Sequence, residues 1–202
     1  TVQHMPRKMP PLKKAEFLVV DVETTGLATD SDLILQIGAV VTNAKGTVLR
    51  SYSTYVRPSN GGSFPWGIEN PPAHHIHGIT NEQLRQGLHT KRAMRQLRRL
   101  ARKRILVAHN AKFDFGFIKS ESQRHSVNIE VDQHLCTLQM SRLLDPKRAE
   151  QHRLTALCEK YNIPLTNAHD ALCDATATAQ LLSILIASHN ARTVNDLYQL
   201  VP

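Results

Sequence analysis

The stretch LVVDVETTGL, residues 18–27, decides which fold and which chemistry the sequence indicates. Its apolar and β-branched residues are typical of a buried strand, yet Asp21 and Glu23 interrupt it two positions apart. Because successive strand side chains point to opposite faces, both carboxylates lie on one face, roughly 6–7 Å apart along the strand. Two such carboxylates repel each other unless a positive charge lies between them, and Mg²⁺ or Mn²⁺ prefers such hard oxygen ligands. Taken alone, the D-x-E pattern also matches a strand end whose acids are simply hydrated.

Two further acids lie in separate segments that lead to the same edge of the expected sheet. Asp114 lies in HNAKFDFGFI, residues 109–118, after a short apolar strand and in the first turn of a helix, where the helix dipole suits an anion. Asp174 lies early in an Ala-rich helix that we expect from about 171 to 188. Because strand ends and helix N-termini of α/β proteins converge on one edge, we expect the four acids to meet there.

A histidine precedes the last of these acids. His169 lies five residues before Asp174, which is about 140° out of alignment on a helix. Both therefore face one site only if His169 precedes the helix, and Asp170 is a suitable N-cap for that arrangement. Because histidine titrates near neutral pH, His169 could take a proton from a metal-bound water there. The alternative is an ordinary surface histidine, since the chain has 11.

The pattern along the chain indicates a mixed sheet with helices on its faces. A turn signal, NAKG, joins two of the expected strands into a hairpin. A loop rich in Gly and Pro follows at 58–80, and the chain beyond 137 reads as helical. We expect a flexible arm over residues 1–14 and a single domain over 15–202. The expected strands are 17–23, 33–42, 47–56, 105–110 and an extended piece at 127–132, and the expected helices include 91–104, 113–125 and a last one that starts at the TVND capping box.

The charge of the chain favours a polyanionic partner. Lys and Arg number 25 against 17 Asp and Glu, a formal net charge of +8. The helix expected at 91–104, KRAMRQLRRLARKR, has many basic residues and no acidic one, with an apolar stripe at helical spacing. Two interpretations stay open: a solvated helix face away from the site, which is the simpler one, or a nucleic-acid contact surface.

Cysteine usage and hydropathy indicate the compartment. The 3 cysteines are widely spaced and form no C-x-x-C pair, which argues against a disulfide framework or a cysteine zinc site. No apolar run approaches the length expected of a membrane-spanning helix, and the basic N-terminal segment is broken by prolines rather than followed by an apolar signal region. We therefore expect a cytoplasmic protein without a membrane partner.

Taken together, three motifs carry a family resemblance. DVETTGL (21–27), HNAKFDFGFI (109–118) and HDALCD (169–174), in this order, resemble the DEDDh (DnaQ-like) family of 3′–5′ exonucleases, the group of the proofreading epsilon subunit of bacterial DNA polymerase III. HGIT (77–80) also matches a family element. CTLQMSRLL (136–144) resembles a segment usually written D-T-L-x-L-A-R, with Cys136 in place of the Asp. The resemblance covers about 17–188 and implies an α/β, ribonuclease-H-like fold with a five-stranded mixed sheet flanked by helices.

The resemblance also implies roles for individual residues. Asp21, Glu23 and Asp174 would hold one Mg²⁺ or Mn²⁺, Asp21 would bridge to a second ion that Asp114 helps to place, and His169 would be the general base. Two metal ions suit an in-line displacement that releases one nucleoside 5′-monophosphate from a 3′ end. The implied substrate-binding residues are Thr24, Thr25, Gly26, Leu27, His109, Asn110 and Phe113.

Two classes of function follow, and each has its own partner. The first is an exonuclease on single-stranded 3′ ends, preferably of DNA, acting alone or with a DNA polymerase subunit; trimming of RNA is the alternative substrate. ETTGL differs from the Glu-Met-Thr-Gly of oligoribonucleases. The second class is an inactive nucleic-acid-binding module of the same fold. The intact set of acids with His169 favours the enzyme, since a pure binder has no chemical need for all of them.

Overall fold

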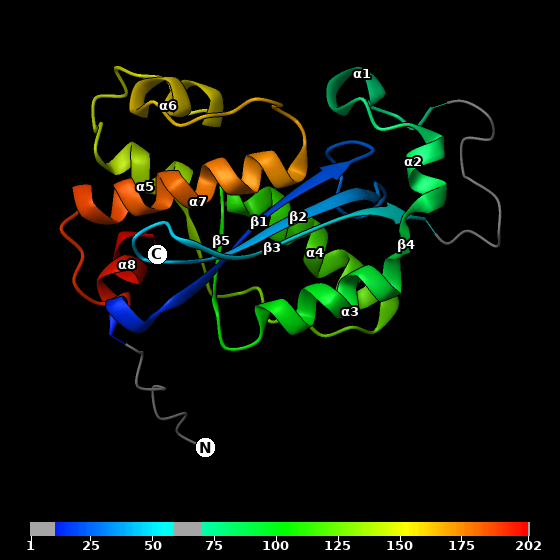
Figure 1. The fold of residues 1–202 in the computed structure, drawn as a ribbon, viewed down its shortest axis with the longest axis horizontal. Coiled ribbons are helices and arrows are strands. Elements are labelled where there is room, and N and C mark those ends of the chain that lie inside the picture. Colours follow the sequence, from blue (N-terminus) through cyan, green and yellow to red (C-terminus); the bar gives the residue numbers. More distant parts are fainter. Residues whose placement is uncertain (1–10, 59–69, 202) are drawn as a thin grey trace.

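A mixed sheet forms the centre of the molecule (Figure 1). The computed structural model describes residues 11–58 and 70–201. Within these residues the sheet has 6 strands in the order β4-β3-β2-β1-β5-β6. The strands are β1 (Glu16–Thr24), β2 (Ile34–Asn43), β3 (Val48–Arg57), β4 (Leu88–His89), β5 (Ile105–Ala108) and β6 (His134–Cys136).

The strand directions place three C-terminal ends at one edge. β1, β2 and β3 form an antiparallel meander, with the expected hairpin between β2 and β3. β5 runs parallel to β1, and β6 parallel to β5. The C-terminal ends of β1, β5 and β6 therefore lie together, as expected for a ligand site in an α/β sheet.

The expectation of five strands is corrected by β4. This strand has only two residues and pairs in parallel with Val56 and Arg57 at the free edge of β3. Two residues are too few to produce the alternation of apolar and polar positions by which a strand is recognised in a sequence. The other five strands keep the antiparallel and parallel arrangement that the family resemblance implies.

Helices cover both faces of the sheet, and β1 shows why. Its residues Leu18, Val20 and Val22 belong to an apolar cluster with α3 and α4, whereas Phe17 and Val19 belong to one with α6, α7 and α8. Figure 1 shows α7 and α3 on opposite sides of the strands. The helices are α1 (His74–His77), α2 (Asn81–Gln86), α3 (Thr90–Ala101), α4 (Ala111–His125), α5 (Thr137–Leu143), α6 (Leu154–Tyr161), α7 (Ala171–Ser188) and α8 (Val194–Leu200).

Some expected elements differ from the structure at their ends. The extended piece expected at 127–132 is not a strand; its alternate residues Val127, Ile129 and Val131 are buried, but the strand itself is β6, a few residues later. The basic helix α3 ends at Ala101 rather than near 104. The capping box of α8 is confirmed, because the Thr193 side chain accepts a hydrogen bond from the backbone N–H of Asp196.

The N-terminal arm is described only in part. Residues 1–10 of the expected arm lie outside the described residues. Residues 11–14, which we also expected in the arm, instead contact the domain: Pro11 forms a bridge with Thr193, and a 3-10 turn, η1 (Leu12–Lys14), buries Leu12 in the cluster that contains α7.

Helix α7 corrects one expectation about apolar segments. By length and composition alone, this 18-residue helix passes as a candidate membrane span. Its apolar residues, however, are largely buried in the cluster that joins it to β1, α6 and α8. Its hydrophobicity is accounted for by its place as a core helix against the sheet.

Candidate active site

Strand β1 presents Asp21 and Glu23 to the face of the sheet that α7 covers. They alternate with Val20 and Val22, which face α3 and α4. In the antiparallel register, Asp21 lies opposite Gly38 and Glu23 opposite Gln36 of β2. The register shifts after Glu23, so the chain leaves regular pairing directly beyond the second acid.

Gly38 allows α7 to approach these acids. A Cβ atom at position 38 would lie 2.1 Å from the backbone of Ala171, the first residue of α7. The buried Gln36 fixes the same point: its Nε2 donates to Asp170 Oδ2 at 3.0 Å, and its Oε1 accepts from Ala171 N at 3.2 Å. Asp170 in turn caps the helix through its Oδ1. The N-terminus of α7 is therefore held against β2, directly beside the acids of β1.

His169 precedes the helix, as expected, and lies with two of the acids. It has a left-handed backbone conformation, φ 67°, and its backbone N–H donates to Asp174 Oδ2 at 3.1 Å. One ligand atom each from Glu23, His169 and Asp174 lie within 4.8 Å of one another. The His169 side chain is exposed, whereas Asp174 is buried. An exposed imidazole thus lies beside one half-buried and one buried carboxyl group.

Asp114 completes the set from the other face of the sheet. It lies in the first turn of α4, is only 2% exposed, and its Oδ1 accepts from the backbone N–H of Val22 at 3.1 Å. This bond ties α4 to β1 at the residue between Asp21 and Glu23. Cys136, which replaces the family's Asp, places its Sγ 3.5 Å from Ala111 N and so takes part in holding the start of α4.

The four carboxyl groups have raised pKa values because they are buried together. Burial, followed by the negative charges of Asp114 and Asp174, raises the pKa of Asp21 well above its ordinary value. Burial and the charge of Asp174 raise the pKa of Glu23 to about 8. Burial also raises the pKa of Asp114 to about 8 and raises that of Asp174. Among the described residues no Lys or Arg forms an ion pair with any of the four.

The donor set fits hard divalent cations. All four acids offer oxygen ligands, and Asp174 Oδ1 is a buried oxygen without a hydrogen-bond partner, which normally costs 1–3 kcal/mol or more for a charged group. A cation bound between Glu23 and Asp174 would satisfy that atom and relieve the mutual repulsion. Asp21 and Asp114 lie outside the tight group formed with His169 but close enough to act on its charges.

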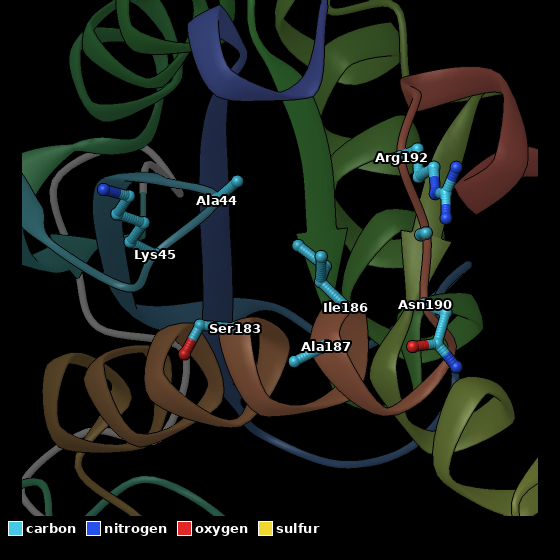
Figure 2. A pocket seen from close by; sticks show the side chains of 8 residues that line it. Ala44, Lys45, Ser183, Ile186, Ala187, Asn190 and Arg192 are labelled. Carbon is cyan, nitrogen blue, oxygen red and sulfur yellow. The ribbon is translucent and has the colours of Figure 1, made fainter.

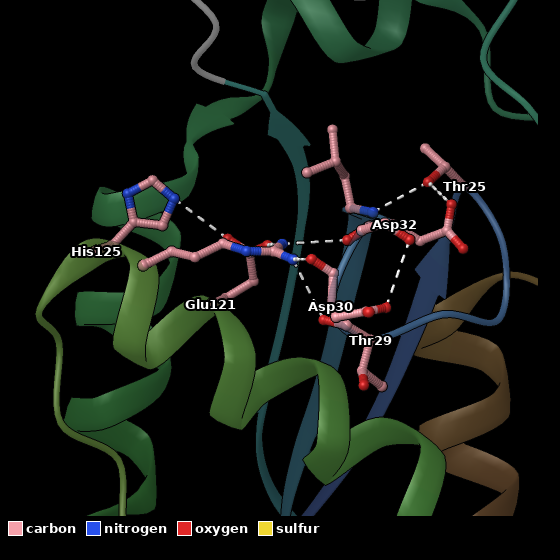
Figure 3. A network of polar contacts seen from close by, with 9 residues as sticks. Thr25, Thr29, Asp30, Asp32, Glu121 and His125 are labelled. Atoms are coloured by element: carbon pink, nitrogen blue, oxygen red, sulfur yellow. Dashed lines mark hydrogen bonds and ion pairs between the residues drawn. The ribbon is translucent and has the colours of Figure 1, made fainter.

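The loop after β1 contains the implied nucleotide-binding residues, and hydrogen bonds with Asp32 shape it (Figure 3). Thr25 Oγ1 donates to Asp32 Oδ1 at 2.8 Å, and Thr24 Oγ1 donates to Gly26 O at 2.6 Å. A Cβ at Gly26 would lie 2.4 Å from the Asp32 carboxylate, so a larger residue there would displace the side chain that holds the loop. Leu27 is 84% exposed, which leaves an apolar side chain free to contact a base.

Helix α4 holds the same loop from the other side, a feature the sequence did not indicate. The Arg124 guanidinium donates to the carbonyl oxygens of Thr29, Asp30 and Asp32 and pairs with the buried Glu121 at 2.6 Å (Figure 3). The three carbonyl groups are more than 90 positions away from Arg124 along the chain. No local pattern in the sequence could have shown this contact.

The three predicted substrate-binding residues near α4 lie in different surroundings. His109 Nδ1 lies 2.9 Å from Thr137 Oγ1 and its Nε2 lies 3.0 Å from the carbonyl oxygen of His152; burial lowers the pKa of His109 to about 4, so it is neutral at pH 7. Phe113 packs against Phe117, with ring centroids 5.0 Å apart. Asn110, the N-cap of α4, is exposed and makes no capping side-chain bond. Their role in substrate binding stays a prediction.

Two cavities accompany these features. One, of about 500 Å³, lies beside the β2–β3 turn and the C-terminal half of α7, with Lys45, Ser183 and Arg192 in its wall (Figure 2). None of the predicted site residues lines it. The other, of about 740 Å³, includes His109 and Asn110. Of these two cavities, only the second is lined by predicted site residues.

Comparison with known proteins identifies a family for nearly the whole chain. The model of the RNase_T exonuclease family matches residues 18–182. The PolC-type DNA polymerase III of Bacillus subtilis is 34% identical over 173 residues, which cover 85% of this chain and 11% of that protein. The 3′-5′ exonuclease DinG of Staphylococcus epidermidis is 32% identical over 169 residues, 83% of this chain and 18% of that protein. The chain thus spans less than a fifth of the length of these two relatives.

Solved structures share the fold. Exonuclease I of E. coli in complex with a dT13 oligonucleotide has a TM-score of 0.73 at 22% identity, covering 88% of this chain and 42% of that one. Exonuclease X in complex with 5′ overhanging duplex DNA has a TM-score of 0.68 at 21% identity, covering 92% of this chain and 99% of that one. The expected ribonuclease-H-like α/β fold is confirmed.

Proposed function

The chain belongs to the RNase_T exonuclease family, and from this premise we propose that it is a metal-dependent 3′–5′ exonuclease that releases nucleoside 5′-monophosphates from single-stranded DNA. One observation carries the proposal: ligand atoms of Glu23, His169 and Asp174, from β1 and the start of α7, lie within 4.8 Å of one another. A module that only binds nucleic acid gains nothing from burying carboxylates that repel both one another and phosphate.

The acids would hold two divalent cations, Mg²⁺ or Mn²⁺. Asp21, Glu23 and Asp174 suit one ion, and Asp21 with Asp114 suits the second. When bound, such a pair of ions activates an attacking water and stabilises the departing 3′-oxygen. The hydrogen bond from Val22 N keeps the Asp114 carboxylate against β1, and the cap of α7 keeps Asp174 beside Glu23.

The remaining residues would orient the substrate and move a proton. His169 is exposed next to the acids, so one of its ring nitrogens can accept the proton of the attacking water. Thr24, Thr25 and Gly26 would lie along the terminal nucleotide, with Leu27 against its base. The loop that contains them is held in one shape by Asp32 and Arg124, which reduces the conformational entropy lost on binding.

DNA is the preferred substrate because the relatives named above are a DNA polymerase and a 3′-5′ exonuclease. The match to a small part of PolC also supports association with a polymerase, either in one longer chain or as a separate subunit. Trimming of RNA 3′ ends is the alternative substrate. All 3 cysteines are free thiols, which agrees with a reducing cytoplasm.

The test is digestion of a 5′-labelled single-stranded DNA and the matched RNA, with EDTA, Mg²⁺ or Mn²⁺. We expect stepwise shortening from the 3′ end of DNA, faster than of RNA, only with a metal ion. Asp21→Ala should abolish it, whereas Asp132→Ala, which removes an exposed acid paired with Lys119 of α4, should not. A ladder that persists in EDTA or in Asp21→Ala would refute the proposal.

A further inference from the structure

A cavity of about 740 Å³ lies at the C-terminal ends of β5 and β6, the same edge of the sheet as the acids. Its wall includes Asn110, which follows β5, and Leu138 and Arg142 of α5, which follows β6. The segment between α5 and α6 closes it with Arg148 and Arg153. Since β5 and β6 run parallel to β1, the cavity lies over the strand ends next to those that carry the acids.

The cavity is strongly positive. Arg142, Arg148 and Arg153 are all exposed, and within the described residues their guanidinium groups make no hydrogen bond or ion pair. The only acid in the wall is Glu150, and it is paired with Lys160. Three uncompensated guanidinium groups around one cavity suit a ligand with several negative charges.

The segment that carries two of these arginines is held in place by a buried histidine. His152 is 9% exposed. Its Nε2 lies 3.2 Å from Asp145 Oδ2 and its Nδ1 lies 3.1 Å from Ser141 Oγ, while its carbonyl oxygen lies 3.0 Å from His109 Nε2. Asp145 Oδ2 also accepts from Glu150 N at 2.9 Å. This network fixes the arginine-bearing segment to α5 and to His109, the residue that follows β5.

The cavity and the acids are near neighbours. Asn110 in the cavity wall and Asp114 in the acid cluster are separated by one turn of α4, about 6 Å along the helix. Neighbouring strands lie about 4.8 Å apart, so the ends of β5 and β6 are roughly 5–10 Å from that of β1. A strand whose last phosphodiester lies at the acids can therefore extend directly over the arginines.

We propose that this cavity binds the phosphodiester backbone of single-stranded DNA upstream of the bond that is cut. The inference rests on the proposed function, because it places the 3′ end of the strand at the acids. Arginine is suited to this role, since its planar guanidinium donates two parallel hydrogen bonds to phosphate oxygens. His109, neutral and internally bonded, then shapes the cavity rather than contributing charge to it.

The basic helix α3 provides the matched control. Arg98 and Arg99 lie near its C-terminal end, on the sheet face opposite α7, and do not line the cavity. The double variant Arg98→Ala/Arg99→Ala removes the same charge as Arg148→Ala/Arg153→Ala. A comparison of the two separates a local phosphate site from a general effect of net charge.

The first measurement is binding of a fluorescein-labelled 12-nucleotide oligo(dT) in EDTA, followed by anisotropy over a range of salt concentrations. For Arg148→Ala/Arg153→Ala we expect Kd to rise roughly tenfold and the slope of log K against log salt to fall by about 1.4, two phosphate contacts of about 0.7 each. For the α3 variant we expect a much smaller change. Equal affinity of the cavity variant and the unchanged protein, or an equal loss in the α3 variant, would overturn the inference.

The second measurement separates this inference from the proposed function. With Mn²⁺, the cavity variant should lose more kcat/KM on a 12-nucleotide strand than on a trinucleotide, which has one phosphodiester upstream of the bond that is cut. It should lose least on the p-nitrophenyl ester of thymidine 5′-monophosphate, which has no upstream phosphate. A loss that is equal on all three substrates contradicts the cavity site while leaving the exonuclease assignment intact. If the unchanged protein hydrolyses none of them, the exonuclease proposal fails, and the anisotropy result alone decides the cavity.

Discussion

Replacing Glu23 by Gln should stabilise the protein in the absence of metal ions while it abolishes turnover. Burial and the charge of Asp174 raise the pKa of Glu23 from 4.5 to about 8, so at intermediate pH the folded state keeps a proton that the unfolded state has lost. The free energy of unfolding is therefore unaffected by Glu23 below the pKa of this residue in the unfolded chain. As pH rises from there towards 8, the free energy of unfolding falls by about 1.4 kcal/mol per pH unit. At pH 7 this cost is on the order of 3 kcal/mol, and glutamine, which is neutral and of the same shape, does not incur it.

The assay is thermal and urea denaturation in EDTA at pH 5 and pH 7. We expect Glu23→Gln to raise Tm by roughly 6–12 °C at pH 7, following about 2–4 °C per kcal/mol for a domain of this size, and by little at pH 5. Saturating Mg²⁺ should reduce or reverse the difference, because it stabilises only the unchanged site. Glu130→Gln, which changes an exposed glutamate, is the control. A Glu23→Gln protein no more stable than the unchanged one at pH 7, or equally stabilised at both pH values, would refute the reasoning.

Three further changes test how the site is held together. Gly38→Ala should displace α7, because its Cβ would lie 2.1 Å from the backbone of Ala171; we expect a loss of activity and a lower Tm, and an unchanged activity would contradict the close contact. Arg124→Ala should release the loop after β1, raising KM more than it lowers kcat, and limited proteolysis should cut first in that loop; Arg124→Lys should restore little, since one ammonium cannot reach three carbonyl groups. His169→Asn should lower kcat by about 10²–10⁴ while DNA binding in EDTA stays the same; a smaller loss would exclude His169 as the base.

The sequence was sufficient for the fold because the elements that define it have strong local patterns. The apolar run interrupted by Asp21 and Glu23, the NAKG turn and the Ala-rich helix each appear where expected, and His169 lies before α7, in agreement with the N-cap expected at Asp170. The two wrong strand predictions concern segments with weak local patterns. Strand β4 has only two residues. At 127–132 every second residue is buried, as in a strand, but the segment is not part of the described sheet. Alternation reports which side chains are buried, not whether the backbone is bonded to a neighbouring strand.

The geometry of the site depends on contacts that no local pattern contains. In the sequence, Gly38 and Gln36 are simply parts of an apolar strand. In the structure they contact Ala171 and Asp170, more than 130 positions later, and so hold the start of α7 against β2. A glycine in a strand signals close approach of another backbone, but its partner is known only once the chain is folded. The acids could be listed from the sequence because metal chemistry restricts residue type. The residues that position the acids could not be listed in the same way, because many uncharged side chains of suitable size and hydrogen-bonding capacity could make the same contacts.

The same distinction explains why the sequence indicated the basic helix α3 but not the cavity lined by Arg142, Arg148 and Arg153. Eight basic residues in 14 positions of α3 and its C-terminal extension are conspicuous in a sequence, but α3 lies along the face of the sheet and does not line the cavity that contains Arg142, Arg148 and Arg153. Arg142, Arg148 and Arg153 are ordinary in number and spacing, and they converge because His152 folds the segment back onto α5. Charge density along a chain therefore measures overall attraction for polyanions, whereas a phosphate site requires convergence in space. If the anisotropy slopes of the two arginine pairs differ as expected, convergence rather than density governs how this domain holds a strand.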